Sequence, residues 1–234
     1  MNYYYLILDL ICFACPFVLS FDKNVAYYKK WRYAIIAIIF TCILFIPWDV
    51  YYTNAGYWGF NETYITGIEI FGLPIEENLF FVLVPFACIF VYECVLFYLP
   101  KTIKQLDTFL SWIHLIAFNA FILAFIILYW DRIYTLSSAI AVLLVINFSA
   151  FVFRNHIAAS LLSFVFILIP FFFINSALTG SYTAEEVVWY NPSTISGLHF
   201  GTIPVEDLFY NILLVSCSLF FYIGYQRIVL KKSI

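Results

Sequence analysis

The chain has 234 residues and a formal net charge of −3 at pH 7, with 65% hydrophobic and only 11% charged residues. Its mean hydropathy of +0.97 is too high for a soluble domain, which could not bury that much apolar surface, so an integral membrane protein is indicated. The slightly acidic balance and the lack of a basic run argue against nucleic-acid binding.

Seven apolar stretches follow one another along the chain, each near the roughly 20 residues that a membrane-spanning helix needs. We expect helices over 3–20, 31–47, 73–99, 109–130, 134–153, 157–178 and 203–226. The first stretch lacks the basic leader of a signal peptide, so we expect it to remain as a spanning helix. The predicted fold class is all-α: a polytopic membrane protein with seven transmembrane helices.

The basic residues are unevenly distributed between these helices. The segments after the first, third, fifth and seventh helices hold ten of the eleven Lys and Arg residues, and only Arg132 falls in the other set. Basic loops stay in the cytoplasm. We therefore predict a multi-pass protein of the cell membrane with its N-terminus outside and its C-terminus cytoplasmic. The outer connections 48–72 and 179–202 are rich in aromatics, which suits either an interfacial belt or a lid over a hydrophobic site.

A motif recurs 130 residues further along the chain. "NETYITGIEIFGLPIEENLF" (61–80) matches "NPSTISGLHFGTIPVEDLFY" (191–210), so that Pro74 corresponds to Pro204 and Glu76 to Glu206. The match predicts a tandem repeat of three helices over 1–100 and 134–234, joined by a linker with the fourth helix over 101–133. With one helix between them, the copies enter the membrane in the same direction, as a parallel repeat.

Each copy of the motif places two adjacent carboxylates about one turn into an apolar helix. These are Glu76 and Glu77 in the first copy and Glu206 and Asp207 in the second. Prolines and acids at a helix start also have a purely structural explanation, because both suit the first turn and the helix dipole. Intramembrane carboxylates nevertheless mark functional sites. Adjacent helical residues point about 100° apart, so we expect Glu76 and Glu206 to face a shared cavity, with Glu77 and Asp207 as supporting or base groups.

A carboxylate cluster in apolar surroundings can keep one proton as a general acid while a neighbour stays ionised as a base. The chemistry predicted is proton transfer to an apolar substrate, with aromatic faces stabilising a carbocation. The candidate substrate contacts are Phe80, Phe81, Phe209, Tyr210, Trp58 and Trp189. His199 and Asp49 are candidate supporting residues, although a plain interfacial histidine and a helix cap are the simpler explanations. No metal, nucleotide or haem motif is visible, so no metal and no cofactor is predicted.

The motifs "LPIEENLFF" and "IPVEDLFY", each opening a membrane helix in a duplicated chain of this size, resemble those of the membrane-embedded carotenoid cyclases. That family includes two-subunit lycopene cyclases of actinobacteria, fused archaeal and bacterial forms, and the cyclase domain of fungal bifunctional enzymes. The resemblance implies a fused lycopene β-cyclase that isomerises lycopene, its lipid-soluble partner, to β-carotene or γ-carotene without a cofactor. It maps the family motif onto Pro74, Glu76 and Glu77, and onto Pro204, Glu206 and Asp207.

Two other functions remain open from the sequence. A proton-coupled transporter also uses parallel repeats and buried carboxylates, and a carotenoid hydratase would trap a similar cation with water. Association with a second copy or with other carotenoid enzymes also stays open.

Overall fold

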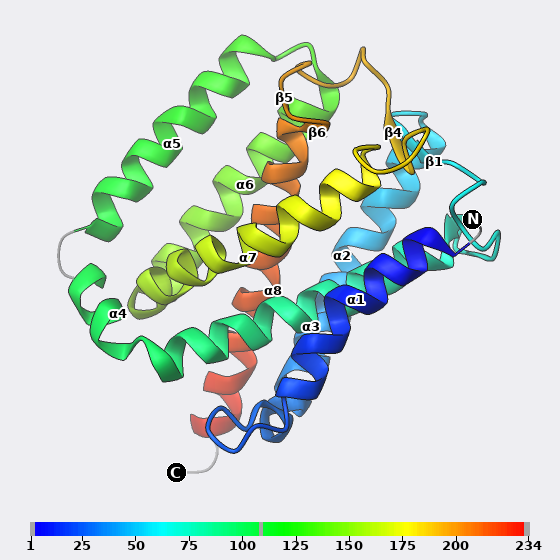
Figure 1. Cartoon of the computed structure of the whole chain (residues 1–234). Helices are drawn as coiled ribbons and strands as arrows, with labels where there is room; N and C mark the ends of the chain where they lie inside the picture. Colours follow the sequence, from blue (N-terminus) through cyan, green and yellow to red (C-terminus); the bar gives the residue numbers. More distant parts are fainter. Residues whose placement is uncertain (1–2, 108–109, 232–234) are drawn as a thin grey trace.

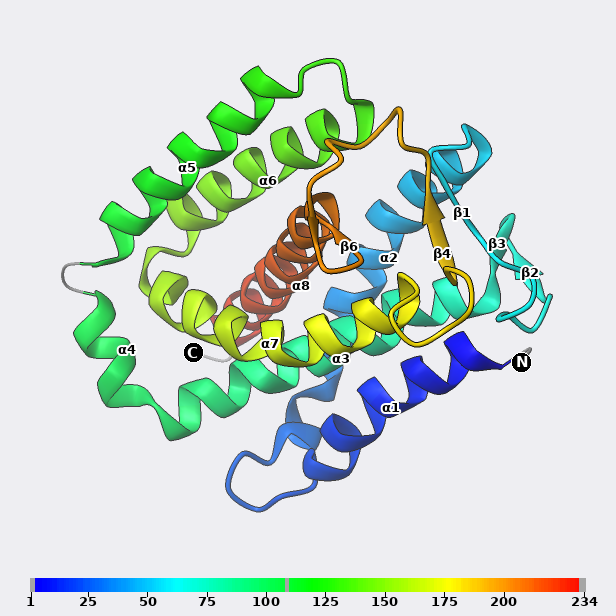
Figure 2. The ribbon, with the colours of Figure 1, turned by 45° about the horizontal axis from the view of Figure 1, so that its top comes forward.

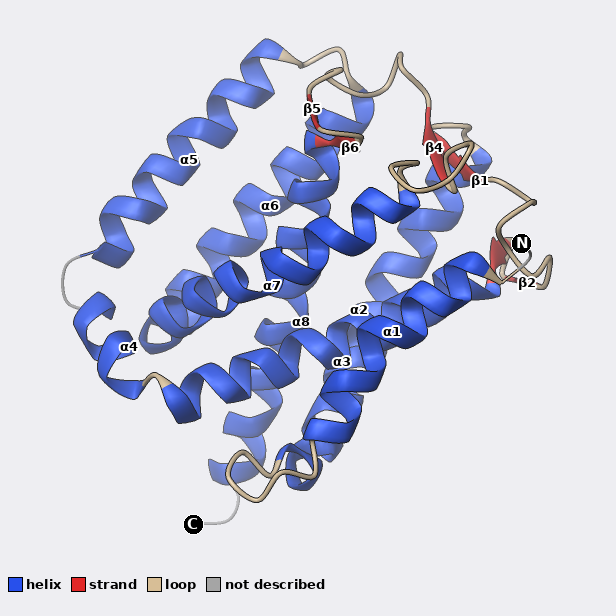
Figure 3. Ribbon diagram, in the orientation of Figure 1, coloured by secondary structure: helices blue, strands red, loops and turns tan. Residues whose placement is uncertain are grey.

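The computed structural model describes residues 3–107 and 110–231, and helices make up most of this part of the chain (Figures 1 and 3). The helices are α1 (Tyr4–Leu19), α2 (Trp31–Asn54), α3 (Ile75–Tyr98), α4 (Pro100–Asp107), α5 (Leu110–Leu128), α6 (Ile133–Val152), α7 (Ile157–Leu178) and α8 (Val205–Lys231). Short 3-10 turns, η1 (Tyr27–Lys30) and η2 (Arg154–His156), precede α2 and α7.

Five of these helical segments are long and apolar enough to cross a membrane. They are Tyr27–Asn54, Ile75–Tyr98, Ile133–Val152, Arg154–Leu178 and Val205–Leu230. Two further apolar helices, Tyr4–Leu19 and Ile113–Leu128, are shorter. The prediction of an all-α membrane protein is therefore confirmed, while two of the seven predicted spans are shorter than the rest.

Two boundaries differ from the sequence prediction. Helix α2 does not stop near Pro47 but continues to Asn54, so the connection after it is shorter than 48–72. Proline is tolerated inside membrane helices because neighbouring groups satisfy the freed backbone carbonyl. The short helix α4 occupies part of the predicted linker, and its polar sequence gave no spanning signal. The predicted helix start at residue 109 lies outside the described residues.

Helices α3 and α8 run through the middle of the fold, α1, α2, α6 and α7 pack around them, and α5 lies on the outside against α6 (Figure 2). Helix α1 lies along α3, and α6 lies along α8. The second helix of each half crosses over: α2 packs most extensively against α8, and α7 packs against α3. The two halves of the chain are therefore interlocked rather than set side by side.

The buried interior differs along the length of the helices. Between α2, α3, α6 and α8 lies an apolar cluster that includes Phe45, Phe81 and Phe209. At the end that carries the Lys and Arg residues, Glu93 of α3 is buried and forms an ion pair with Lys30. The Tyr222 hydroxyl of α8 donates a hydrogen bond to Glu93 at 2.5 Å. The ion pair with Lys30 offsets the desolvation cost of this buried charge, and Glu93 lies far from the two acidic motifs.

Short strands lie at the opposite end, which we call the hairpin end. Strands β2 (Glu69–Ile70) and β3 (Leu73–Pro74) form a hairpin that leads into α3, and β5 (His199–Phe200) and β6 (Ile203–Pro204) form one that leads into α8. Strand β1 (Trp58–Phe60) pairs antiparallel with β4 (Val188–Tyr190), with Gly59 opposite Trp189. Each half thus contributes one strand to a pair that joins the two halves.

Candidate active site

The loop before each hairpin is closed by the first acid of the motif that follows it. The Thr66 backbone N–H donates to Glu76 Oε1 at 2.7 Å, and the Ser196 backbone N–H donates to Glu206 Oε1 at 2.6 Å. The next residue in each loop, Gly67 or Gly197, has φ +80°, a left-handed conformation that glycine adopts without strain. This geometry explains why the loop sequence recurs together with the acid.

Glu76 and Glu206 are fully buried by these contacts, each at 0% exposure. The Thr135 hydroxyl donates a second hydrogen bond to Glu206. Neither glutamate lies among the side chains that line the main cavity, which instead include Glu77 and Asp207. The expectation that Glu76 and Glu206 point into a cavity is therefore wrong, and the adjacent residue of each motif holds that position.

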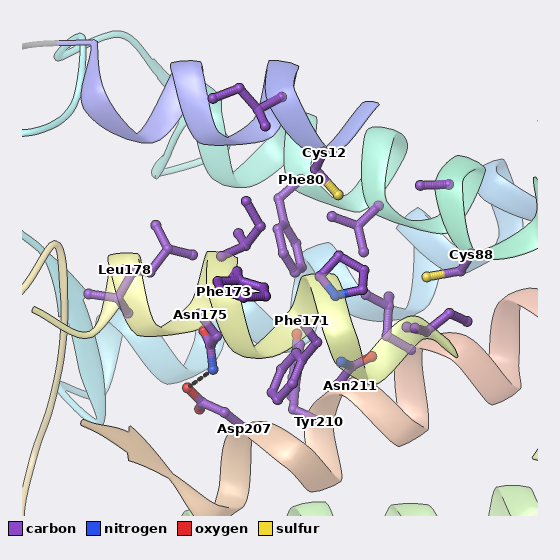
Figure 4. Close-up of a pocket in the computed structure, with 18 of the residues that line it drawn as sticks. Cys12, Phe80, Cys88, Phe171, Phe173, Asn175, Leu178, Asp207, Tyr210 and Asn211 are labelled. Carbon is purple, nitrogen blue, oxygen red and sulfur yellow. Dashed lines mark hydrogen bonds between the residues drawn. The ribbon is translucent and has the colours of Figure 1, made fainter. Parts of the chain in front are cut away.

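The cavity lies between α1, α3, α7 and α8 and has a volume of about 620 Å³. Its polar side chains gather at the hairpin end, and the remainder of its wall is apolar or aromatic (Figure 4). Along α3 the lining runs from Glu77 to Val91, about 21 Å at the helical rise. The lining residues Ile11 of α1 and Ile169 and Phe173 of α7 are exposed, so the apolar part opens sideways between α1 and α7.

On the first-half side of the cavity, two carboxyl groups that line it lie together, and a third, the buried Asp9 of α1, interacts electrostatically with Glu77. The Tyr5 hydroxyl donates to Glu77 Oε2 at 2.6 Å, and the Tyr210 hydroxyl donates to Asp49 Oδ1 at 2.9 Å. Asp49 and Glu77 interact electrostatically with each other, and Asp49 Oδ2 is buried without a hydrogen-bond partner. Asp49 was predicted to be a helix cap or a supporting residue. Because α2 continues to Asn54, it lies inside the helix and is not a cap.

On the second-half side, one carboxylate is surrounded by neutral donors. Asn175 Nδ2 donates to Asp207 Oδ2 at 2.8 Å, as Figure 4 shows, and the Tyr190 hydroxyl donates to the same oxygen at 2.9 Å. The Tyr134 hydroxyl donates to Asp207 Oδ1 at 3.3 Å. Burial, and then the Asp207 carboxylate, raise the pKa of Tyr190 well above its usual value of 10.0, so this hydroxyl keeps its proton and remains a donor.

The structure divides the predicted aromatic contacts into two groups. Trp58, Phe80 and Tyr210 line the cavity. Phe81 and Phe209 lie instead in the apolar cluster between α2, α3, α6 and α8. These two phenylalanines therefore do not line the cavity, although Phe81 packs against Tyr210, which does.

The remaining predicted residues lie around the site rather than in it. Trp189 is 42% exposed and packs over Gly59 outside the cavity, so it is not a lining residue. His199 is exposed on β5, where its Nδ1 lies 3.0 Å from the Gly197 carbonyl oxygen. Pro74 and Pro204 end strands β3 and β6 directly before α3 and α8. The prolines therefore set where the acidic helices begin.

Five polar residues of the site were missed in the sequence: Tyr5, Tyr134, Asn175, Tyr190 and Asn211. Tyr5 and Tyr134 hold matching positions at the starts of α1 and α6. The Tyr5 backbone N–H donates a hydrogen bond to the Tyr64 carbonyl, and the Tyr134 backbone N–H donates one to the Thr194 carbonyl. Both carbonyls belong to the loop before the hairpin of the same half. The sequence signal that could have identified these two residues is a tyrosine at the start of the first helix of each half. It was missed because the chain contains 19 tyrosines.

Among residues 3–107 and 110–231, no group of three or more His, Cys, Asp or Glu side chains is placed to hold a metal ion. The carboxyl groups that line the cavity can directly transfer protons to and from an apolar molecule bound there.

Comparison with known proteins assigns the family. Neither the curated proteins nor the solved structures gave a match. A family model described as lycopene cyclase matches the chain twice, over residues 2–95 and 131–224. Each match ends beyond one of the two acidic motifs, and together they cover more than half of the sequence. The chain therefore belongs to the lycopene cyclase family.

Proposed function

We propose that this protein closes the linear end groups of lycopene to β-ionone rings, using its own carboxyl groups and no cofactor. The observation that carries the proposal is that Glu77 and Asp207, one from each copy of the motif, line the polar end of one cavity whose wall is otherwise mostly apolar. An apolar polyene fits such a wall, and the two carboxyl groups supply the acid and base that its isomerisation needs.

The reaction needs one proton in and one proton out. A carboxylic acid adds a proton to the terminal double bond of the end group, which leaves a tertiary cation. The neighbouring alkene attacks this cation, so a carbon–carbon bond closes the six-membered ring and the positive charge moves into the ring. A carboxylate then removes a ring proton, which leaves the ring double bond. The product is an isomer of the substrate. The faces of Trp58, Phe80 and Tyr210 stabilise the cationic stages.

The shape of the cavity suggests how the substrate lies. The end group occupies the polar hairpin end, beside Glu77 and Asp207. The polyene extends along α3 toward Val91, about 21 Å away. The opening beside Ile11 and Phe173 lets a lipid-dissolved substrate enter sideways, because both side chains are exposed toward the bilayer.

The membrane arrangement is part of the proposal. We place seven spans in the membrane, with α1 and α5 as the two short ones, and the hairpin end outside the cell. The N-terminus is then outside and the C-terminus is cytoplasmic, as the basic loops require. The halves 1–100 and 134–234 act as two copies of one unit around a linker over 101–133. Matched hairpins and matched Thr66–Glu76 and Ser196–Glu206 hydrogen bonds support this division.

Expression of the wild-type chain in cells that accumulate lycopene is expected to convert most of that pigment to ringed carotenoids. The products are separated by chromatography and identified by absorption and mass, and an empty vector is the control. Unchanged lycopene beside well-inserted protein would contradict the proposal and favour a transporter. A product heavier than lycopene by one water would instead indicate a hydratase.

Cyclisation in heavy water is expected to add one deuterium to each ring formed, because the proton that starts the reaction comes from an exchangeable carboxyl group. Mass spectrometry of the products then shows one extra mass unit for a single ring and two for a doubly ringed product. Ringed products without deuterium would mean that the carboxyl groups are not the proton source.

A further inference from the structure

The two halves of the site differ by one charge at a matched position. Asp49 is the nineteenth residue of α2, and Asn175 is the nineteenth residue of α7. Each faces the second acid of one motif: Asp49 interacts with Glu77, and Asn175 donates to Asp207 at 2.8 Å. The first half therefore has two carboxyl groups where the second half has one carboxylate and one amide.

This difference fixes where a proton can reside. Among the described residues that line the cavity, none is Lys, Arg or His. Two adjacent buried carboxylates without a cation would each carry a large desolvation cost and would repel each other. A proton held between Asp49 and Glu77 would remove this cost. Asp207 has no second carboxyl group at the matched position. Its three neutral donors, Asn175, Tyr134 and Tyr190, stabilise it as an anion.

Asp49 is also placed to act on a substrate rather than only on Glu77. Its side chain lines the cavity, and the residue is 2% exposed. One oxygen accepts the Tyr210 hydroxyl at 2.9 Å, while Oδ2 makes no hydrogen bond of normal geometry, although Asp49 interacts with Glu77 and Trp58. A buried polar atom without a partner is uncommon and needs an explanation. A proton shared with Glu77 and delivered into the cavity provides one.

We propose that Asp49 is a further catalytic residue, which together with Glu77 holds and delivers the proton that starts cyclisation, while Asp207 is the base that ends it. The inference rests on the proposed function and assigns the acid and the base within it. After each ring closure Asp207 carries the proton taken from the ring, and the Asp49–Glu77 pair lacks one. Before the next turnover Asp207 releases its proton to water and the pair takes one up from water, so the cycle has no net proton change.

The test uses the full chain in lipid vesicles that contain lycopene. Asp49→Asn is expected to lower kcat for ring formation by at least about 100-fold, within the range for loss of a general acid. The KM for lycopene should change little, because an amide of the same shape remains in the wall. Asp49→Glu should restore part of the rate. The matched control is Asp131→Asn, which removes an exposed carboxylate and should cyclise like the wild type.

A second variant separates a catalytic role from a structural one. In the double variant Asp49→Asn with Asn175→Asp, the second carboxyl group moves beside Asp207 and the amide moves beside Glu77. The roles of the two halves are then exchanged, and the rate is expected to rise at least about tenfold above that of Asp49→Asn alone. A residue that only maintained the packing of α2 would not be rescued by a change on α7.

The outcomes distinguish this inference from the proposed function. If the wild type forms no ringed product in the same vesicles, the proposed function fails. If the wild type cyclises and folded Asp49→Asn keeps the wild-type rate, only the role of Asp49 is overturned. Should Asp49→Asn not fold, Asp49→Ser replaces it with the same expectation, since a small hydroxyl still accepts the Tyr210 hydrogen bond. Failure of the charge exchange to restore activity in a folded protein also counts against the inference.

Discussion

Glu77→Gln is expected to abolish ring formation, whereas Gln at the adjacent Glu76 leaves most of the activity. Glu77 lines the cavity and bonds the Tyr5 hydroxyl, so its amide can no longer share or deliver a proton. Loss of a general acid typically lowers the rate by about 100-fold to 10,000-fold. Glu76 accepts the Thr66 backbone N–H, and the carbonyl oxygen of Gln accepts the same hydrogen bond. We therefore expect Glu76→Gln to lose less than about tenfold.

The measurement is the rate of ring formation for each purified variant, with insertion and thermal stability checked in parallel. The second half repeats the contrast: Asp207→Asn should be inactive, and Glu206→Gln should stay active. Loss of activity in Glu76→Gln and Glu206→Gln, with full activity in Glu77→Gln and Asp207→Asn, would reverse the assignment. The catalytic groups would then be Glu76 and Glu206, as the sequence alone predicted.

Ala87→Phe is expected to block the reaction without touching any carboxyl group. Ala87 lines the apolar part of the cavity on α3, about 15 Å along the helix from Glu77. A phenyl ring there fills the path that the polyene needs, and we expect kcat/KM for lycopene to fall at least about 100-fold. Overpacking typically costs about 1–3 kcal/mol of folding stability, so the melting temperature is measured beside the rate.

Two controls show whether Ala87→Phe blocks the reaction by obstructing the long polyene chain of the substrate. Ile35→Phe enlarges an exposed side chain on α2 and should leave cyclisation unchanged. A short alkene that carries only the linear end group should still be cyclised by Ala87→Phe, because the acids remain accessible. If the variant cyclises lycopene at the wild-type rate, the polyene does not lie along α3, and the proposed orientation is wrong.

The sequence predicted the fold well because hydrophobic segments and helix-start motifs are local signals. Helices α3 and α8 were predicted to begin at 73 and 203, and they begin at Ile75 and Val205. The family was also identified correctly from the two acidic motifs. These features depend on apolar length and on proline position, both of which are visible along the chain.

The details of the site depend on how each helix is rotated about its axis, which one sequence does not determine. Neighbouring residues point about 100° apart. A motif with two acids therefore leaves open whether Glu76 or Glu77 faces the cavity. Glu76 instead accepts a hydrogen bond from the Thr66 backbone N–H, so Glu77 is the acid that lines the cavity. This hydrogen bond joins residues ten apart, and no spacing rule predicts it. Asp49 was misread because Pro47 was taken as a helix end.

The pairing of β1 with β4 also has a consequence for biosynthesis. The Asn61 N–H donates to the Val187 carbonyl and the Asn191 N–H donates to the Tyr57 carbonyl, so each half completes the backbone hydrogen bonds of the other. During translation the N-terminal half leaves the ribosome first. Strand β1 must then wait for its partner until four-fifths of the polypeptide has been made. Asp49 likewise lacks its Tyr210 hydrogen bond until that residue is synthesised, so the proposed activity can arise only when about nine-tenths of the chain has been made.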